Sequence, residues 1–255
     1  MCLIVFAQNY HPRYRLVLAI NRDEFFERPT APAEFWPDAR HVLAGRDLER
    51  GGTWFGVSTH GRVAAVTNYR EPHPRIAHGK SRGMLVLDYL NGSAGVEEYL
   101  ERIMGDGESY GGFNLLLGDG ERLFHCSNRG GEIAVVPPGI HGLSNHVLDT
   151  PWPKVVTAKQ RLETLLQNAE LCQEELLSLI SDSSRFLDHL LPDTGIGLPR
   201  ERMLSPMFIS GDTYGTRSST LLLIDHDKRV TFVEQSYGRH QTPGGLARFS
   251  FIAEP

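Results

Sequence analysis

The order of strand-like and helix-like segments constrains this fold more than any other feature of the sequence. β-type runs occupy the first quarter, two helical segments lie within residues 84–104, and strand-like runs return over residues 113–143. A second helical block covers residues 155–191, and strand-like runs at 219–224 and 230–234 follow. Strands and helices that come in blocks favour an α+β fold with antiparallel sheets and outer helix pairs over a Rossmann order.

Turn residues divide the strand blocks into hairpins. His60-Gly61, Asp119-Gly120 and residues 225–228 each separate two apolar runs, and glycine tolerates the positive φ of tight turns. Residues 27–38 are polar and contain proline, so we expect a loop there, and we expect a glycine-containing tail after residue 234. The second helical block is expected to end at a group of breakers, namely Pro192, Gly195, Gly197 and Pro199. No linker or repeat divides the chain, which predicts one domain over residues 1–255.

Composition excludes several classes of function. The net charge is −5 and the sequence holds no basic run, which argues against a nucleic-acid partner. No apolar run approaches the roughly 18–20 residues that cross a bilayer, so stable membrane insertion is not expected. Residues 1–7 are too short for a secretory signal, and the three cysteines are odd in number and widely spaced. We therefore expect a cytoplasmic protein without disulfides, structural metal or cofactor; the oligomeric state stays open.

Cys2 is the position that most clearly suggests chemistry. An initiator methionine is normally removed ahead of so small a residue, which leaves a thiol and a free α-amine on Cys2. The amine titrates near ~7.7–8.0 and the thiol near ~8.5, so the amine can serve as the base for its own side chain. The alternative is structural, because cysteine is often a small buried hydrophobe and Cys2 precedes an apolar strand.

Polar groups gather where other predicted strands end. The segment Asn21-Arg22-Asp23-Glu24 directly follows a strand; its aspartate can hold a terminal amine and its arginine can steady a thiolate. The alternative is a solvated loop with ion pairs. Asn68 and Asn145 also follow strands, where asparagine either donates to an oxyanion or caps a turn. Arg217 precedes a late strand and can bind a substrate carboxylate or complete the charge network around the thiol.

Six segments, in this order, resemble the NRDE family, also called the transport and Golgi organisation protein 2 family. They are Met1-Cys2-Leu3-Ile4, Asn21-Arg22-Asp23-Glu24, Gly51-Gly52-Thr53-Trp54-Phe55-Gly56, Val66-Thr67-Asn68-Tyr69-Arg70, Gly142-Leu143-Ser144-Asn145 and Tyr214-Gly215-Thr216-Arg217-Ser218-Ser219-Thr220. The resemblance spans residues 2–234. It implies the N-terminal-nucleophile hydrolase fold, a four-layer αββα sandwich of two antiparallel sheets flanked by helices. More distantly, the pattern is similar to the cysteine choloylglycine and penicillin V acylases.

The resemblance also implies roles for individual residues. The catalytic set would be Cys2 as nucleophile with Asp23, the oxyanion groups Asn68 and Asn145, and the late arginine Arg217. Substrate contacts would come from Asn21, Arg22 and Tyr69. One departure concerns the early arginine and aspartate, which are spaced apart in the acylases. Here Arg22 and Asp23 are adjacent in the sequence, so their two side chains cannot both point in the directions that the acylase residues take.

Three functions remain open from the sequence. The first is an amidohydrolase in which the Cys2 thiolate attacks a linear amide, or a thioester, of a small molecule. The second is a carrier or trafficking protein that holds a hydrophobic ligand such as haem or an acyl chain, which follows from the family resemblance. The third is an interaction module without chemistry, in which case the polar site residues would be scattered.

Overall fold

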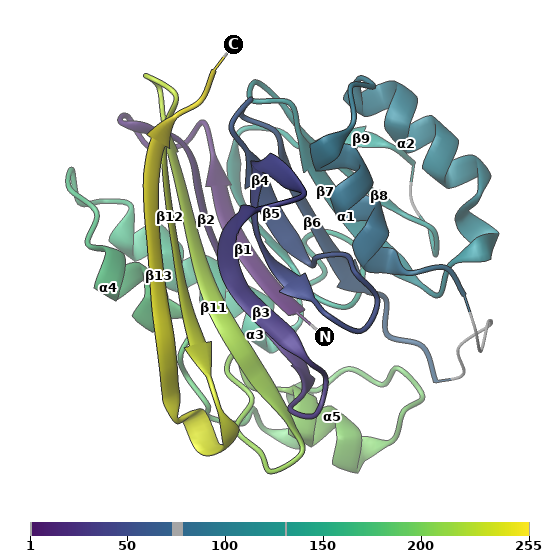
Figure 1. Ribbon diagram of the computed structural model, residues 1–255. Coiled ribbons are helices and arrows are strands. Elements are labelled where there is room, and N and C mark those ends of the chain that lie inside the picture. Colours follow the sequence, from purple (N-terminus) through teal and green to yellow (C-terminus); the bar gives the residue numbers. More distant parts are fainter. Residues whose placement is uncertain (1, 73–78, 131, 255) are drawn as a thin grey trace.

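Two antiparallel sheets pack face to face in the computed structural model, which describes residues 2–72, 79–130 and 132–254 (Figure 1). The first sheet has the strand order β10 (Gly139–Leu143), β1 (Cys2–Gln8), β2 (Tyr14–Phe25), β11 (Tyr214–Asp225), β12 (Arg229–Tyr237) and β13 (Pro243–Ile252). The second sheet has the order β3 (Thr30–Trp36), β4 (Ala39–Asp47), β5 (Phe55–Ser58), β6 (Val63–Asn68), β7 (Phe113–Gly118), β8 (Leu123–Ser127) and β9 (Ala134–Val135). Strand β1 therefore lies inside its sheet, between β10 and β2.

Helices cover the outer face of each sheet. The helices α1 (Arg82–Asn91) and α2 (Val96–Gly105) pack on the second sheet, while α3 (Pro153–Leu165) and α4 (Gln173–Leu179) pack on the first (Figure 1). A fifth helix, α5 (Leu198–Leu204), and the short 3₁₀ turns η1 (Gly107–Ser109), η2 (Asp188–Leu190) and η3 (Arg239–Gln241) complete the helical elements of the described residues. None of these described helices has the length and apolarity to cross a membrane.

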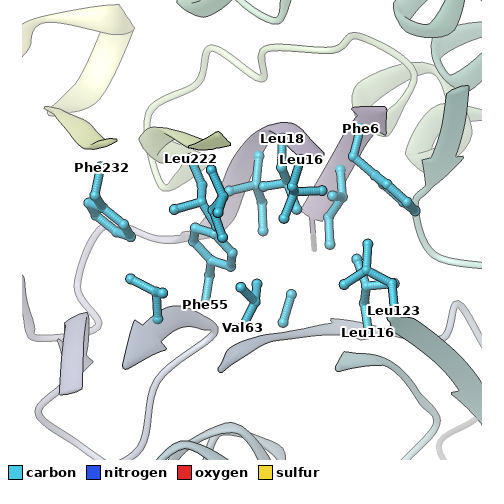
Figure 2. Close-up of a cluster of buried hydrophobic side chains, with 14 of the residues drawn as sticks. Phe6, Leu16, Leu18, Phe55, Val63, Leu116, Leu123, Leu222 and Phe232 are labelled. Atoms are coloured by element: carbon cyan, nitrogen blue, oxygen red, sulfur yellow. The ribbon is translucent and has the colours of Figure 1, made fainter. Parts of the chain in front are cut away.

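Three hydrophobic clusters hold the four layers together. The central one fills the space between the sheets, where side chains from both sheets meet (Figure 2). Those labelled there are Phe6, Leu16, Leu18, Phe55, Val63, Leu116, Leu123, Leu222 and Phe232. The other two clusters join each sheet to its helix pair. In β1, alternation sends Ile4 and Phe6 to the central cluster and Leu3 and Val5 to the helix side, which confirms the αββα layering.

The predicted hairpins are confirmed. The turn between β5 and β6 contains Gly61 with φ +76°, and that between β7 and β8 contains Gly120 with φ +90°. The turn between β11 and β12 contains Lys228 with φ +63°. Helix α2 also forms where the pattern predicts it. Its buried residues Val96, Tyr99, Leu100 and Ile103 keep the i, i+3, i+4, i+7 spacing.

Two segments expected to lack regular structure are edge strands instead. Residues 27–38 contain β3, where Pro32 is tolerated because it lies at the sheet edge and the register shifts between Ala31 and Glu34. The expected tail contains β13, which pairs with β12 and is largely exposed. An edge strand with few buried side chains carries little hydrophobic pattern, so sequence periodicity misses it.

The end of the second helical block was also predicted wrongly. The apolar stripe at residues 186–191 forms only the turn η2, and α5 begins after Gly197, among residues that we expected to break helices. Proline is compatible with the first turn of a helix because the backbone N–H it lacks has no partner there. Pro199 therefore belongs to the start of α5 instead of ending a helix.

Candidate active site

Cys2 begins a central strand and lies against the space between the two sheets. It pairs with Arg22 across β1 and β2, and both residues share the face that carries Ile4 and Ile20 further along the strands. Its backbone carbonyl is 3.0 Å from the Ser144 hydroxyl. Only 6% of Cys2 is exposed, yet the residue lines a large cavity. The nucleophile candidate is thus held by two neighbouring strands at a cavity wall.

The cavity has a volume of about 610 Å³ and a strongly charged lining. Strand β2 contributes Arg22, Asp23 and Glu24, and the end of β6 contributes Asn68 and the residues that follow it. Other ionisable side chains in the wall are Arg28, Asp47, Glu49, Arg50, Arg70, Glu71, Lys80, Arg82 and Arg200. The large apolar side chains in the wall are Trp54, Val66, Ile196 and Leu204. Such a lining suits a polar or charged molecule.

Burial raises the pKa of the Cys2 thiol. The Asp23 carboxylate raises it further, whereas the Arg22 guanidinium opposes the shift. Desolvation favours the neutral thiol over the thiolate, so the thiol of Cys2 is not activated by its surroundings alone. Nucleophilic chemistry at this position therefore requires a base close to the sulfur.

Asp23 is fixed by β11 on one side. Its Oδ1 accepts a hydrogen bond of 2.7 Å from the Thr216 hydroxyl, and its backbone carbonyl accepts one of 3.0 Å from the Tyr214 hydroxyl. Burial raises the pKa of the Asp23 carboxyl, while the charge of Lys154 and the bond from Thr216 oppose that shift. Asp23 is only 1% exposed, and its carboxyl has a well-defined orientation.

Arg22 and Asp23 point to opposite faces of β2, as neighbours in a strand do. The Arg22 guanidinium lies over the Trp54 ring, 4.2 Å from its centroid, and donates to the Thr30 hydroxyl at 3.2 Å. Burial lowers the pKa of Arg22, opposed by Glu24 and Cys2. Because Arg22 and Asp23 are adjacent in the strand, the Arg22 cation lies beside the Cys2 thiol on the inner face of the sheet, and Asp23 lies on the outer face.

The two asparagines meet at the end of β6. The Asn145 amide Nδ2 donates to the backbone carbonyl of Asn68 at 3.0 Å, and its Oδ1 lies 3.2 Å from the Ser144 hydroxyl. Asn145 is fully buried and is absent from the cavity lining, whereas Asn68 is half-buried and contributes to it. Tyr69 also lines the cavity, with its ring 4.9 Å from that of His146. The structure therefore brings Asn68 and Tyr69 to the cavity and puts Asn145 behind Asn68.

Asn21 and Arg217 do not reach the cavity. Asn21 points to the helix side of its sheet, where Nδ2 donates to the carbonyls of Ile180 at 2.7 Å and Met207 at 2.8 Å. Its Oδ1 accepts from the Ser219 hydroxyl at 2.6 Å, so all of its described bonds are internal. The expected contact of Asn21 with substrate does not fit this position, because its amide ties a strand to the helix layer.

Arg217 is the extra residue of a β-bulge. The register of β11 against β2 shifts between Thr216 and Ser218, and Arg217 lies between them. Its Nη1 donates to the carbonyls of Phe25 at 2.8 Å and Arg28 at 3.0 Å. Burial lowers the pKa of Arg22, and the charge of Arg217 makes a smaller contribution in the same direction. The described contacts of Arg217 brace the end of β2.

Sequence reasoning missed a buried charge cluster next to this site. Arg70 and Glu201 form an ion pair of 2.5 Å, and the Arg70 guanidinium lies 4.5 Å from the Trp152 ring centroid. Lys154 is 3% exposed and donates to the Leu204 carbonyl at 3.1 Å. Glu201 and Lys154 belong to helices far along the chain, so neither lay near a recognised motif. The available signal was Lys154 itself, a cation at the start of an otherwise apolar helix stripe.

Within residues 2–72, 79–130 and 132–254, His, Cys, Asp and Glu side chains form no group of three or more that could hold a metal ion.

Comparisons with known proteins agree with this architecture. A family model described as Transport and Golgi organisation 2 matches residues 1–239. The transport and Golgi organization protein 2 homolog of Bos taurus is 38% identical over 261 residues, with 92% of this chain and 93% of that protein covered. Transport and Golgi organization protein 2 of Drosophila melanogaster is 31% identical over 273 residues, with 92% of each chain covered. Among solved structures, conjugated bile acid hydrolase from Clostridium perfringens superposes with a TM-score of 0.57 at 8% identity, covering 98% of this chain and 92% of that one.

Proposed function

Because the chain belongs to the transport and Golgi organisation 2 family and has the N-terminal-nucleophile hydrolase fold, we propose that it is a cysteine amidohydrolase for a linear amide or thioester of a small molecule. The observation that carries the proposal is the position of Cys2. It starts a central strand at the wall of a cavity of about 610 Å³, with the Arg22 guanidinium on the same face. A buried structural cysteine needs neither the cavity nor the neighbouring charges.

The reaction begins once Met1 has been removed. The α-amine of Cys2 takes the thiol proton, and Sγ attacks the carbonyl carbon of the substrate. The tetrahedral oxyanion accepts a hydrogen bond from the Asn68 side chain, which Asn145 keeps in place through the Asn68 backbone. The C–N bond then breaks as the ammonium returns its proton to the leaving nitrogen. Water hydrolyses the thioester on Cys2 and releases the acid and the free thiol.

Each charged neighbour has a part in this scheme. Asp23 orients the amine of residue 2, since its carboxylate is fixed by Thr216. Arg22 stabilises the thiolate from the inner face, because its cation opposes the effect of burial on the Cys2 pKa. Arg217 acts indirectly by bracing the end of β2 through Phe25 and Arg28.

The carrier alternative has less support from the cavity. Haem or an acyl chain would need a predominantly apolar wall, and most of the residues that line this cavity are charged or polar. A haem titration distinguishes the two functions. A saturable Soret shift that Cys2→Ala leaves unchanged, together with no hydrolysis, would favour carriage.

The test is a screen of small amides and thioesters with protein whose intact mass shows that Met1 is absent. We expect turnover, and an acyl adduct that peptide mapping assigns to Cys2. Cys2→Ala should abolish both, whereas Cys172→Ala, which removes an exposed thiol, should change neither. Full turnover by Cys2→Ala would overturn the proposal.

A further inference from the structure

Lys154 occupies a place that a lysine does not ordinarily take. It is the second residue of α3 (Pro153–Leu165), where the positive end of the helix dipole disfavours a cation, and α3 has no acidic residue in its first turn. The residue is also 3% exposed, so its ammonium has lost most of its water. Its ammonium donates a hydrogen bond to a backbone carbonyl, that of Leu204. A charge in this position needs compensation from other elements.

That compensation comes from the proposed active site. Burial and, after it, the charge of Arg70 lower the pKa of Lys154 to about 8. Asp23 of β2, Cys2 of β1 and Glu201 of α5 act in the opposite direction. The effect is mutual, because the Lys154 charge in turn lowers the pKa of Asp23 against burial. These are the charged groups that act on Lys154 from the elements packed around it.

The packing shows why these groups meet. Helix α3 lies on the outer face of β1, where Val155 and Leu3 belong to one cluster. Asp23 points to that same outer face of β2, two residues after Asn21, whose amide contacts the helix layer. Lys154 and Glu201 line a small hollow together with Arg70, which also lines the main cavity. Lys154 therefore lies on the helix side of Asp23, whereas substrate would reach Cys2 from the cavity.

We infer that Lys154 is a positioning residue: its charge keeps the Asp23 carboxyl ionised so that it can orient the α-amine of residue 2, and the same charge offsets the effect of that carboxylate on the Cys2 thiol; this role rests on the proposed function. A positive charge near Asp23 keeps its carboxyl ionised and able to orient the α-amine of residue 2. The same charge lowers the cost of forming a thiolate in a buried setting. A neutral side chain of similar length would support the packing but not the chemistry.

The experiment follows the rate of Cys2 alkylation by iodoacetamide as a function of pH, with peptide mass mapping to separate Cys2 from the other thiols. It uses protein without Met1 and needs no substrate. Lys154→Met should slow alkylation at pH 7 about tenfold, as a shift of about one pKa unit implies. The profile should move to higher pH, and Lys154→Arg should restore most of the rate. The matched control is Lys159→Met in the same helix, whose ion pair with Asp149 lies outside the cavity lining.

The outcomes separate this inference from the proposed function. A Lys154→Met profile that coincides with wild type, in protein with an unchanged melting temperature, overturns the role of Lys154. If Lys154→Met does not fold, Lys154→Gln carries the same test, since it keeps a donor for Leu204. If both Lys154 variants fail to fold while Lys159→Met folds, Lys154 is required for stability, and the inference is overturned. Absence of amide or thioester turnover, with the shift in alkylation still present, counts against the hydrolase and not against Lys154.

Discussion

Arg70 and Glu201 form an ion pair that is almost completely shielded from solvent, with 2.5 Å between Nη1 and Oε2 and side-chain exposures of 4% and 2%. Glu201 Oε1 also accepts from the Thr194 hydroxyl at 2.5 Å. The pair joins the residue that follows Tyr69 to α5, and α5 contributes Arg200 and Leu204 to the cavity wall. The shape of that wall therefore depends on a buried charge pair.

Glu201→Gln should destabilise the protein by about 3–5 kcal/mol, because it leaves the Arg70 charge buried without its counter-ion. Chemical denaturation at pH 7 measures the loss. Arg202→Gln is the control on the same helix, since its ion pair with Asp188 is exposed, and it should leave stability nearly unchanged. Equal losses for the two variants would contradict the importance of burial.

Asn21→Ala should lower stability by about 2–4 kcal/mol, because the carbonyls of Ile180 and Met207 and the hydroxyl of Ser219 lose a buried partner. The KM for any substrate found should stay unchanged, since Asn21 does not line the cavity. Thermal denaturation and steady-state kinetics measure the two effects. A raised KM at unchanged stability would restore Asn21 as a substrate contact.

Asn68→Ala should reduce kcat by about 10²–10³ with little change in KM, as loss of an oxyanion donor does. Asn145→Ala should act through the Asn68 backbone, so the double variant should lose little more activity than the worse single variant. The measurement is a double-mutant cycle in kcat on one substrate. Additive losses would show that the two amides act independently.

The stability of the protein should fall in acid because of His125. Burial lowers the pKa of His125 to about 4, below its ordinary 6.5, and its Nε2 has no hydrogen-bond partner among the described residues. The folded state favours neutral imidazole, so this contribution to stability is complete above pH 6.5 and is lost as pH falls towards 4. The shift of about 2.5 units corresponds to about 3 kcal/mol.

His125→Leu should remove that part of the acid sensitivity. Denaturant unfolding between pH 7 and 4 should then show a stability curve flatter than that of wild type by about 3 kcal/mol. His141→Gln is not a suitable control, because His141 contacts Asp149 directly. His41→Gln, at a partly exposed position on β4, should keep the wild-type curve. An unchanged slope in His125→Leu would assign the acid sensitivity to other groups.

Local chemistry made part of this structure predictable. Glycine turns such as Gly61 and Gly120 act over a few residues, so hairpins followed directly from the sequence. Cys2 and Asp23 were also identified, although their meeting rests on the β1–β2 register. The buried charge cluster could not be predicted from the sequence, because Arg70 and Glu201 are 131 residues apart in the chain and no local pattern indicates their pairing. Patterning likewise could not show that Asn145 stands behind Asn68.

The bulge at Arg217 changes how side chains alternate along β11. Before it Thr216 faces Asp23, and after it Ser218 faces Arg22, so two residues that are two positions apart in β11 lie on opposite faces of the sheet. Deletion of Arg217 would close the bulge into a regular ladder in which both of these pairs are kept. The deletion would remove the guanidinium that donates to the carbonyls of Phe25 and Arg28. Selection on this stretch therefore acts on the side chain of the extra residue more than on the length of the strand.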